Sequence, residues 1–346
     1  MLSTLTPGKR SAARRILSVA ALMAATGLAG CGADEESPAP RNNPEVGFEL
    51  RDASGLAHYR ENLFVIVRDT DLLPASPRLG VIAMREDAPP AYRPLNVDWT
   101  RVGHVPDDLE SICAVPGATN EFLVVESGAG AERPARIIRL RLTGIRLNDV
   151  RAQVDGKIDL PEIVHNIEGA TLIPGADGRL VLVLCERDER KAAANAGGSD
   201  ERQRHTLLLW AGIDLDGYRL DGPLRTTAVH AAVWPAGPGR VRTCSDLFYD
   251  AEAAGGPRLW IAATADPGAV GPFQSIVYRA RVAQHDLARP EGLTMRAAWR
   301  MDGLKVEGLA APLLPGAGLT MVTDEDLMGG VIRSLPAPTL LDDGDG

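Results

Sequence analysis

Five copies of a short pattern predict an all-β chain folded as a five-bladed β-propeller. Each copy begins with a serine or a glutamate and opens a short apolar strand. A second apolar strand follows after a turn, and two further β-patterned runs follow in most units. Four strands per repeat are typical of a propeller blade. The five copies are Ser54–Ala57, Glu110–Cys113, Glu168–Thr171, Ser245–Phe248 and Glu307–Ala310.

The second strand of each repeat ends in an acid. Turn residues separate the two strands where a hairpin needs them, as in Pro116-Gly117 and Pro315-Gly316. This recurrence predicts that each pair of strands is a hairpin. The second strands run from Leu63 to Asp69, Phe122 to Glu126, Leu180 to Glu186, Leu259 to Asp266 and Leu319 to Asp324.

The spacing of the repeats sets the number of blades. The period is roughly 60 residues once the polar insert 191–203 is removed from the long third interval. Five blades then fill residues 46–336, with a disordered acidic tail at 337–346. The strand-like segment 45–51 is expected to pair with the last blade and close the ring, which hides both sheet edges. A sixth blade within the long interval is the alternative.

The N-terminus reads as an export signal. Basic residues precede a short apolar run, Ile16–Leu28, which is too short to span a bilayer. The run ends in Leu28-Ala29-Gly30-Cys31, which resembles the bacterial lipobox. The resemblance implies that residues 1–30 are removed and that Cys31 is lipidated. Residues 31–45 then form a flexible tether, and the chain is anchored in a membrane, the outer one in a diderm.

The net charge limits the classes of binding partner, and the cysteine content limits the possible disulfides and metal sites. The net charge of −9 becomes −13 after the signal is removed, which disfavours nucleic acid as a partner. A monomer is expected. Cys113, Cys185 and Cys244 match no metal motif. They are either buried thiols or, in an oxidising compartment, one disulfide and one free thiol.

Blade geometry predicts two rings of oxygen ligands at one end of the propeller axis. Crowded carboxylates must take up protons or hold a cation, and calcium accepts such hard oxygen ligands. The alternative is that these acids cap turns or pair with arginines on the rim. The inner ring is Ser54, Glu110, Glu168, Ser245 and Glu307, and the second ring is Asp69, Glu126, Glu186, Asp266 and Asp324.

The order serine, glutamate, glutamate, serine, glutamate resembles the series that holds the central calcium in calcium-dependent apyrases, which are five-bladed propellers. This resemblance covers the five blade starts and implies hydrolysis of nucleoside di- and triphosphates. The low aromatic content of 4% departs from that family. The Glu-Gly-Leu-Ala type of repeat also resembles the esterase-like phytase group of bacterial propellers.

Two hypotheses about function follow. In the first, the protein is a calcium-dependent phosphohydrolase of the cell envelope that acts on nucleotides or other phosphate esters. The ion polarises phosphoryl oxygens, and an acid among Glu126, Glu186 and Asp324 orients the attacking water. In the second, the propeller is not catalytic: calcium stabilises the ring, and the propeller face binds a ligand or a protein partner.

Overall fold

The computed structural model describes residues 50–338, apart from short gaps at 70–76, 86–87, 129–133, 163, 165, 176, 188–205, 232–234, 238–239, 254, 268–270, 289–291, 314–315 and 326–328. These residues belong to the larger of two compact units, Pro40–Gly346. The expected signal, the lipidated Cys31, the tether, most of the closing strand, the insert 191–203 and most of the acidic tail lie outside the described residues. Among the described residues, no helix is long and apolar enough to span a bilayer.

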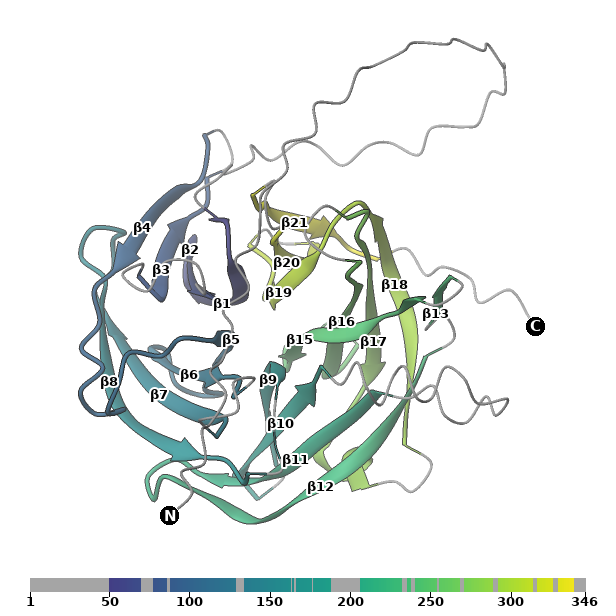
Figure 1. Ribbon diagram of the computed structural model, residues 1–346, viewed down its shortest axis with the longest axis horizontal. Helices are drawn as coiled ribbons and strands as arrows, with labels where there is room; N and C mark the ends of the chain where they lie inside the picture. The colour runs from purple at the N-terminus through teal and green to yellow at the C-terminus, as the bar shows by residue number, and fades with distance from the viewer. Residues whose placement is uncertain are drawn as a thin grey trace, which may run out of the picture. The chain divides into compact units, whose positions relative to one another are not determined.

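The described chain is a five-bladed β-propeller, as the sequence predicts (Figure 1). Neighbouring strands in each blade are antiparallel. Blade 1 contains β1 (Ala53–Arg60), β2 (Leu63–Arg68), β3 (Leu79–Ala83) and β4 (Ala91–Leu95), and blade 2 contains β5 (Leu109–Ala114), β6 (Glu121–Glu126), β7 (Arg136–Thr143) and β8 (Arg151–Asp159).

The remaining blades follow in chain order. Blade 3 contains β9 (Ile167–Pro174), β10 (Leu180–Glu186), β11 (Thr206–Asp214) and β12 (Arg219–Ala231). Blade 4 contains β15 (Thr243–Asp250), β16 (Arg258–Ala265), β17 (Gln274–Arg281) and β18 (Leu293–Asp302), with a 3-10 helix, η3 (Gln284–Ala288), before β18. Blade 5 contains β19 (Val306–Ala310), β20 (Ala317–Thr323) and β21 (Ile332–Pro336).

The long third interval holds no sixth blade among its described residues. Its strands β11 and β12 complete blade 3, and only a short ribbon of β13 (Pro235–Gly237) and β14 (Arg240–Val241) follows. The outer strand β12 pairs in parallel with β18 over Val229–Ala231 and Leu293–Met295. Blades 3 and 4 therefore share one eight-stranded sheet, which the sequence pattern did not predict.

The inner strands β1, β5, β9, β15 and β19 lie nearest the centre of Figure 1, and each contacts the inner strands of both neighbouring blades, β19 and β1 included. Leu50, near the end of the predicted closing segment, is fully buried in a cluster with Val322 and Ile332 of blade 5. The start of the described chain thus packs on the last blade. The strand pairing itself falls at residues that are not described.

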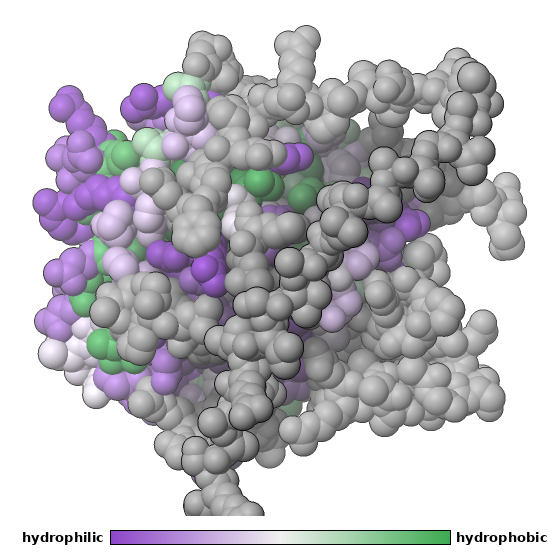
Figure 2. Space-filling model, turned by 45° about the horizontal axis from the view of Figure 1, so that its top comes forward, coloured by the Kyte–Doolittle hydropathy of each residue, from purple (hydrophilic) through white to green (hydrophobic). Residues whose placement is uncertain are grey.

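The core lies between the blades. Alternating apolar residues of the inner and middle strands fill the space between neighbouring sheets, as amphipathic strands must when both faces are covered. Polar residues predominate on the described surface that is visible in Figure 2. Among the described residues, Val105 and Ile145 are the exposed large hydrophobic side chains.

A disulfide joins two blades. Cys185 on β10 is bonded to Cys244 on β15, with the two Cα atoms 6.3 Å apart, and Cys113 is a buried free thiol. The structure therefore selects the alternative of one bridge and one free thiol. Burial raises the pKa of Cys113 to about 12, so this thiol stays protonated and unreactive.

Candidate functional site

The five residues predicted as the inner ring occupy one equivalent position, a β-bulge in the innermost strands. At this position the pairing with the second strand skips one residue in every blade. A bulge leaves its extra residue unpaired and turns its side chain away from the regular alternation. The skipped residues are Ser54, Glu110, Glu168, Ser245 and Glu307.

The residue after each bulge packs against the next inner strand. A Cβ atom on Gly169 would lie 2.8 Å from the Cα atom of Asp246, and one on Gly308 would lie 2.7 Å from the amide nitrogen of Leu56. Real Cβ atoms do not approach backbone so closely. Glycine is therefore required for these backbones to meet.

Ser111 and Asp246, which follow the bulges of blades 2 and 4, fill the middle of the ring. Ser111 donates to Asp246 (3.1 Å) and accepts from the Ala170 amide (3.0 Å), while Asp246 also accepts from the Leu309 amide (2.7 Å). Burial raises the pKa of Asp246 well above its usual range. This network ties together blades 2, 3, 4 and 5.

The three bulge glutamates come together at the axis. Glu168 and Glu307 are 3% and 5% exposed, and Glu110 is half-buried. Burial is the main cause that raises the pKa of each, and the other glutamates add to it for Glu110 and Glu168. The pKa of Glu168 reaches about 8 even though Arg187 lowers it. Glu168 thus holds a proton at neutral pH.

Two cations lie among the acids of blades 3, 4 and 5. Arg187 places one terminal nitrogen 3.5 Å from Glu168 and the other 3.0 Å from Asp266. Lys305 lies 3.5 Å from the same oxygen of Asp266 and 3.3 Å from Glu307. This part of the site therefore combines a protonated carboxyl with a carboxylate that two cations favour in its charged form.

The acids of blades 1 and 2 form a separate group. Oxygen atoms of Asp69, Asp108 and Glu110 lie within 4.8 Å of one another. Asp69 and Asp108 are brought together by an antiparallel bridge, and Oδ2 of Asp108 is buried without a hydrogen-bond partner among the described residues. This carboxylate cluster could hold a metal ion. The sequence pattern did not predict Asp108 as a ligand, because this residue lies two positions before the repeated motif.

The two bulge serines connect blades. Ser54 donates to the Leu109 carbonyl, and Ser245 donates to the Val306 carbonyl at 2.6 Å. In each case the acceptor immediately precedes the bulge glutamate of the next inner strand in the ring. The serines thereby position Glu110 and Glu307.

The residues predicted as catalytic do not gather at one point. Glu126 is buried against His104 (2.8 Å) and Arg136 (3.3 Å) on blade 2. Asp324 accepts from the Asp52 amide at 3.2 Å, and Glu186 is half-buried at the end of β10. Of the second ring, Asp69 lies beside Glu110, and Asp266 shares Arg187 with Glu168.

Comparison with known proteins finds no matching family model and no matching curated protein. Solved structures do match. The RS223 β-xylosidase has a TM-score of 0.51 at 10% identity, over 84% of this chain and 96% of that one. An exo-1,5-α-L-arabinanase from a bovine ruminal metagenomic library has a TM-score of 0.48 at 13% identity, over 84% and 93% of the two chains. A family-43 glycoside hydrolase from Xanthomonas citri has a TM-score of 0.48 at 11% identity, over 84% and 90%.

These matches correct the expected relationship. The resemblance to apyrases and phytases is wrong, because the RS223 structure that this chain matches is described as a β-xylosidase. The expected hydrolysis of nucleotides or phosphate esters is wrong for the same reason. The motif order misled because it marks a β-bulge that recurs in all five blades, which is a feature of the fold, and a fold does not by itself imply an activity. The likeness, at such low identity, establishes the five-bladed fold.

Proposed function

We propose that the axial site hydrolyses glycosidic bonds. Two considerations support the proposal: the fold is shared with a protein described as a β-xylosidase, and the site contains carboxyl groups in contrasting environments. Glycosidases generally use one carboxylic acid to protonate the leaving oxygen and one carboxylate to activate water or attack the sugar. Two carboxyl groups whose environments separate their protonation are the expected arrangement.

Glu168 and Asp266 are the pair that carries this proposal. Glu168, with a pKa of about 8, is the proton donor. Asp266, held by Arg187 and Lys305, is the carboxylate. Because both carboxyl groups contact the same guanidinium, their oxygens are at most about 9 Å apart, a limit that is compatible with the spacing of glycosidase pairs. The anomer of the product will tell whether Asp266 activates water or attacks the sugar carbon.

Arg187 and Lys305 have a positioning role. Their positive charges lower the pKa of Glu168 and Glu307, which opposes the effect of burial. Both acids can therefore still release a proton. Arg187 also fixes the distance between the two carboxyl groups. In a catalytic site such supports preserve the geometry of the reacting groups.

We further propose that the cluster of Asp69, Asp108 and Glu110 binds calcium. Hard carboxylate oxygens in flexible geometry suit this ion, which also draws on carbonyls and water. One neighbouring structure, a β-xylosidase/α-arabinofuranosidase, is described as a calcium-free form. The ion would neutralise the acids that blades 1 and 2 bring to the axis, and it would stabilise the ring.

The enzymatic proposal is tested with chromogenic pentosides and with arabinan and xylan. The protein is expected to release sugar from at least one of these substrates, and Glu168→Gln should lower kcat by at least 100-fold, since an acid contributes about that much to catalysis. Glu162→Gln, which changes an exposed carboxylate, is the matched control. Absence of both hydrolysis and binding of every pentoside would contradict the proposal.

A further inference from the structure

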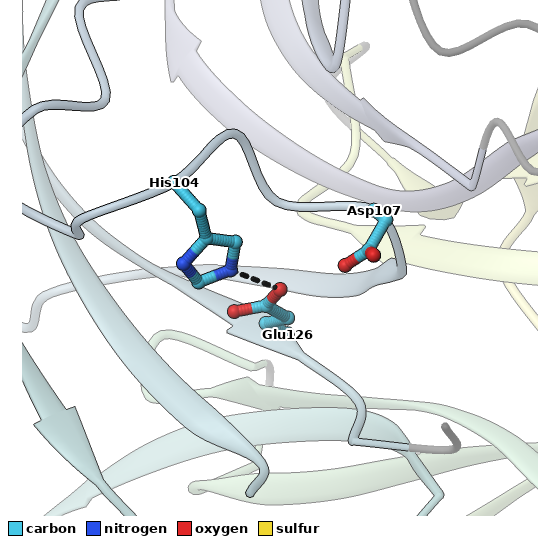
Figure 3. A group of neighbouring side chains, drawn as sticks. All are labelled: His104, Asp107 and Glu126. Carbon is cyan, nitrogen blue, oxygen red and sulfur yellow. Dashed lines mark hydrogen bonds and ion pairs between the residues drawn. The ribbon is translucent and has the colours of Figure 1, made fainter. Parts of the chain in front are cut away.

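A second group of potential ligands lies on blade 2, apart from Arg187 and Lys305. Donor atoms of His104, Asp107 and Glu126 lie within 4.8 Å of one another. Figure 3 shows the imidazole and both carboxylates turned toward one another, with a 2.8 Å contact between His104 Nε2 and Glu126 Oε1. Two chain segments supply them: the loop before β5 supplies His104 and Asp107, and the end of β6 supplies Glu126.

The loop that carries His104 is held in place by its own backbone. The amides of Val102 and Gly103 both donate to the Trp99 carbonyl, at 2.9 and 3.2 Å. Gly103 has a φ of 96°, a left-handed conformation that favours glycine, and it turns the chain into His104. These contacts hold the backbone that carries His104, and its ring is held by Glu126 at 2.8 Å and by Arg136 at 3.1 Å.

Cross-strand neighbours orient Glu126. Arg136 on β7 is its direct partner in the sheet, and Arg136 contacts Oε2 of Glu126 at 3.3 Å. The Nε atom of Arg136 donates to Asp159 on β8 at 2.8 Å. Because Arg136 engages Oε2, the other oxygen, Oε1, is directed at His104. Such outer contacts are what orient the carboxylate ligands of metal sites.

The balance of charge in this group favours a cation. Glu126 is 2% exposed, and Asp107 brings a second carboxylate close to it. The guanidinium of Arg136 lies against Glu126 and, at 3.1 Å, against both ring nitrogens of His104, while Asp159 also pairs with Lys157. A single positive charge on Arg136 thus faces the two ligand acids. Burying a carboxylate beside another costs free energy unless a positive charge compensates.

We propose that His104, Asp107 and Glu126 bind a divalent transition-metal ion, with zinc as the representative. The imidazole nitrogen excludes calcium as the preferred ion and favours zinc, which takes nitrogen and carboxylate ligands together. Tetrahedral zinc places its ligands roughly 3.3 Å apart. The exposed side chain of Asp107 can rotate to close the remaining distance. Three protein ligands leave the fourth position for water or a substrate oxygen.

The test measures zinc binding by calorimetry on the full-length chain, after treatment with chelator and in excess calcium to occupy the axial acids. One equivalent of zinc is expected to bind. His104→Gln and Asp107→Asn should each weaken the affinity at least tenfold. Both residues lie on a loop, so these variants remain informative if Glu126→Gln does not fold. Cobalt in place of zinc should give visible absorption bands that His104→Gln removes.

Two controls make the outcome decisive. His285 is 77% exposed and lies 3.3 Å from Asp286, so His285→Gln removes a histidine beside a single acid and should leave zinc affinity unchanged. Glu110→Gln alters the axial cluster and should also leave it unchanged. The proposal is overturned if the wild-type protein binds no zinc, if His104→Gln binds zinc as the wild type does, or if either control weakens binding equally.

Discussion

Ser245 donates a 2.6 Å hydrogen bond to the carbonyl of Val306, across the boundary between blades 4 and 5. Val306 immediately precedes Glu307, so this bond positions one of the axial acids. Ser54 and Leu109 repeat the arrangement between blades 1 and 2. A motif residue that looked like a ligand is thus also a connection between blades.

Ser245→Ala should lower the free energy of unfolding by about 1 kcal/mol, the usual net contribution of one buried hydrogen bond. The Val306 carbonyl retains its bond from Thr264 at 3.1 Å, which limits the loss. Denaturant titration measures the effect, and Thr143→Ala, at an exposed position on β7, is the control. An unchanged denaturation midpoint would refute the role assigned to Ser245.

Stability should fall as the pH rises from about 4.5 to about 8. Unfolded chains release the Glu168 proton near 4.5, whereas the folded protein keeps it until about 8. Between these values the unfolded state binds fewer protons, so the free energy of unfolding decreases with pH. Thermal unfolding in chelator measures this slope. Glu168→Gln should flatten it, and Glu162→Gln should not.

Calcium should raise the melting temperature through Asp69, Asp108 and Glu110. At a calcium concentration 100 times the Kd, the stabilisation is about 2.7 kcal/mol. Glu110→Gln should abolish this shift without destabilising the calcium-free protein, because it removes a half-buried acid that is crowded by other acids. Differential scanning calorimetry provides the measurement. An equal calcium shift in the variant would place the ion elsewhere.

Loss of the Cys185–Cys244 disulfide should lower the free energy of unfolding by about 4 kcal/mol at most, since the bond closes a loop of 59 residues. The double alanine variant is compared with the wild type with and without reductant. Reductant should destabilise only the wild type, because Cys113 is buried and unreactive. Equal sensitivity of both proteins to reductant would argue against the bond.

Cys31 is proposed as the lipid anchor of an exported protein. Cys31→Ala should abolish incorporation of labelled palmitate and release the protein from the membrane fraction of the producing cells. The propeller should fold as before, because the first described contact, Leu50 on blade 5, lies well after the substitution. Palmitate labelling of the alanine variant would contradict this assignment.

Much of the fold is readable from the sequence. The repeat predicts five blades, because every blade must present a strand of small and apolar residues to its neighbours. It also identifies Glu110, Glu168 and Glu307 as residues at equivalent positions. The β-bulges at which these glutamates lie cannot be predicted from the sequence, because a bulge depends on the pairing register with the second strand.

Only the structure shows which residues contact the axial acids. Arg187 lies in a mixed-charge stretch of the sequence, which is typical of a solvated loop. In the structure its guanidinium contacts both Glu168 and Asp266. Asp108 lies outside the repeated motif, and Asp69 comes from another blade. No local pattern relates residues so far apart in the chain.

By itself, the sequence determined the all-β class, the number of blades and the equivalence of the five bulge positions, since these follow from local hydrophobic pattern and periodicity. Only the tertiary structure decided which acids meet, which are neutralised by Arg187 and Lys305, and which lie together at Asp69, Asp108 and Glu110. The physical reason is that protonation and metal binding depend on distance and burial, and both are set by how the blades close around their common axis.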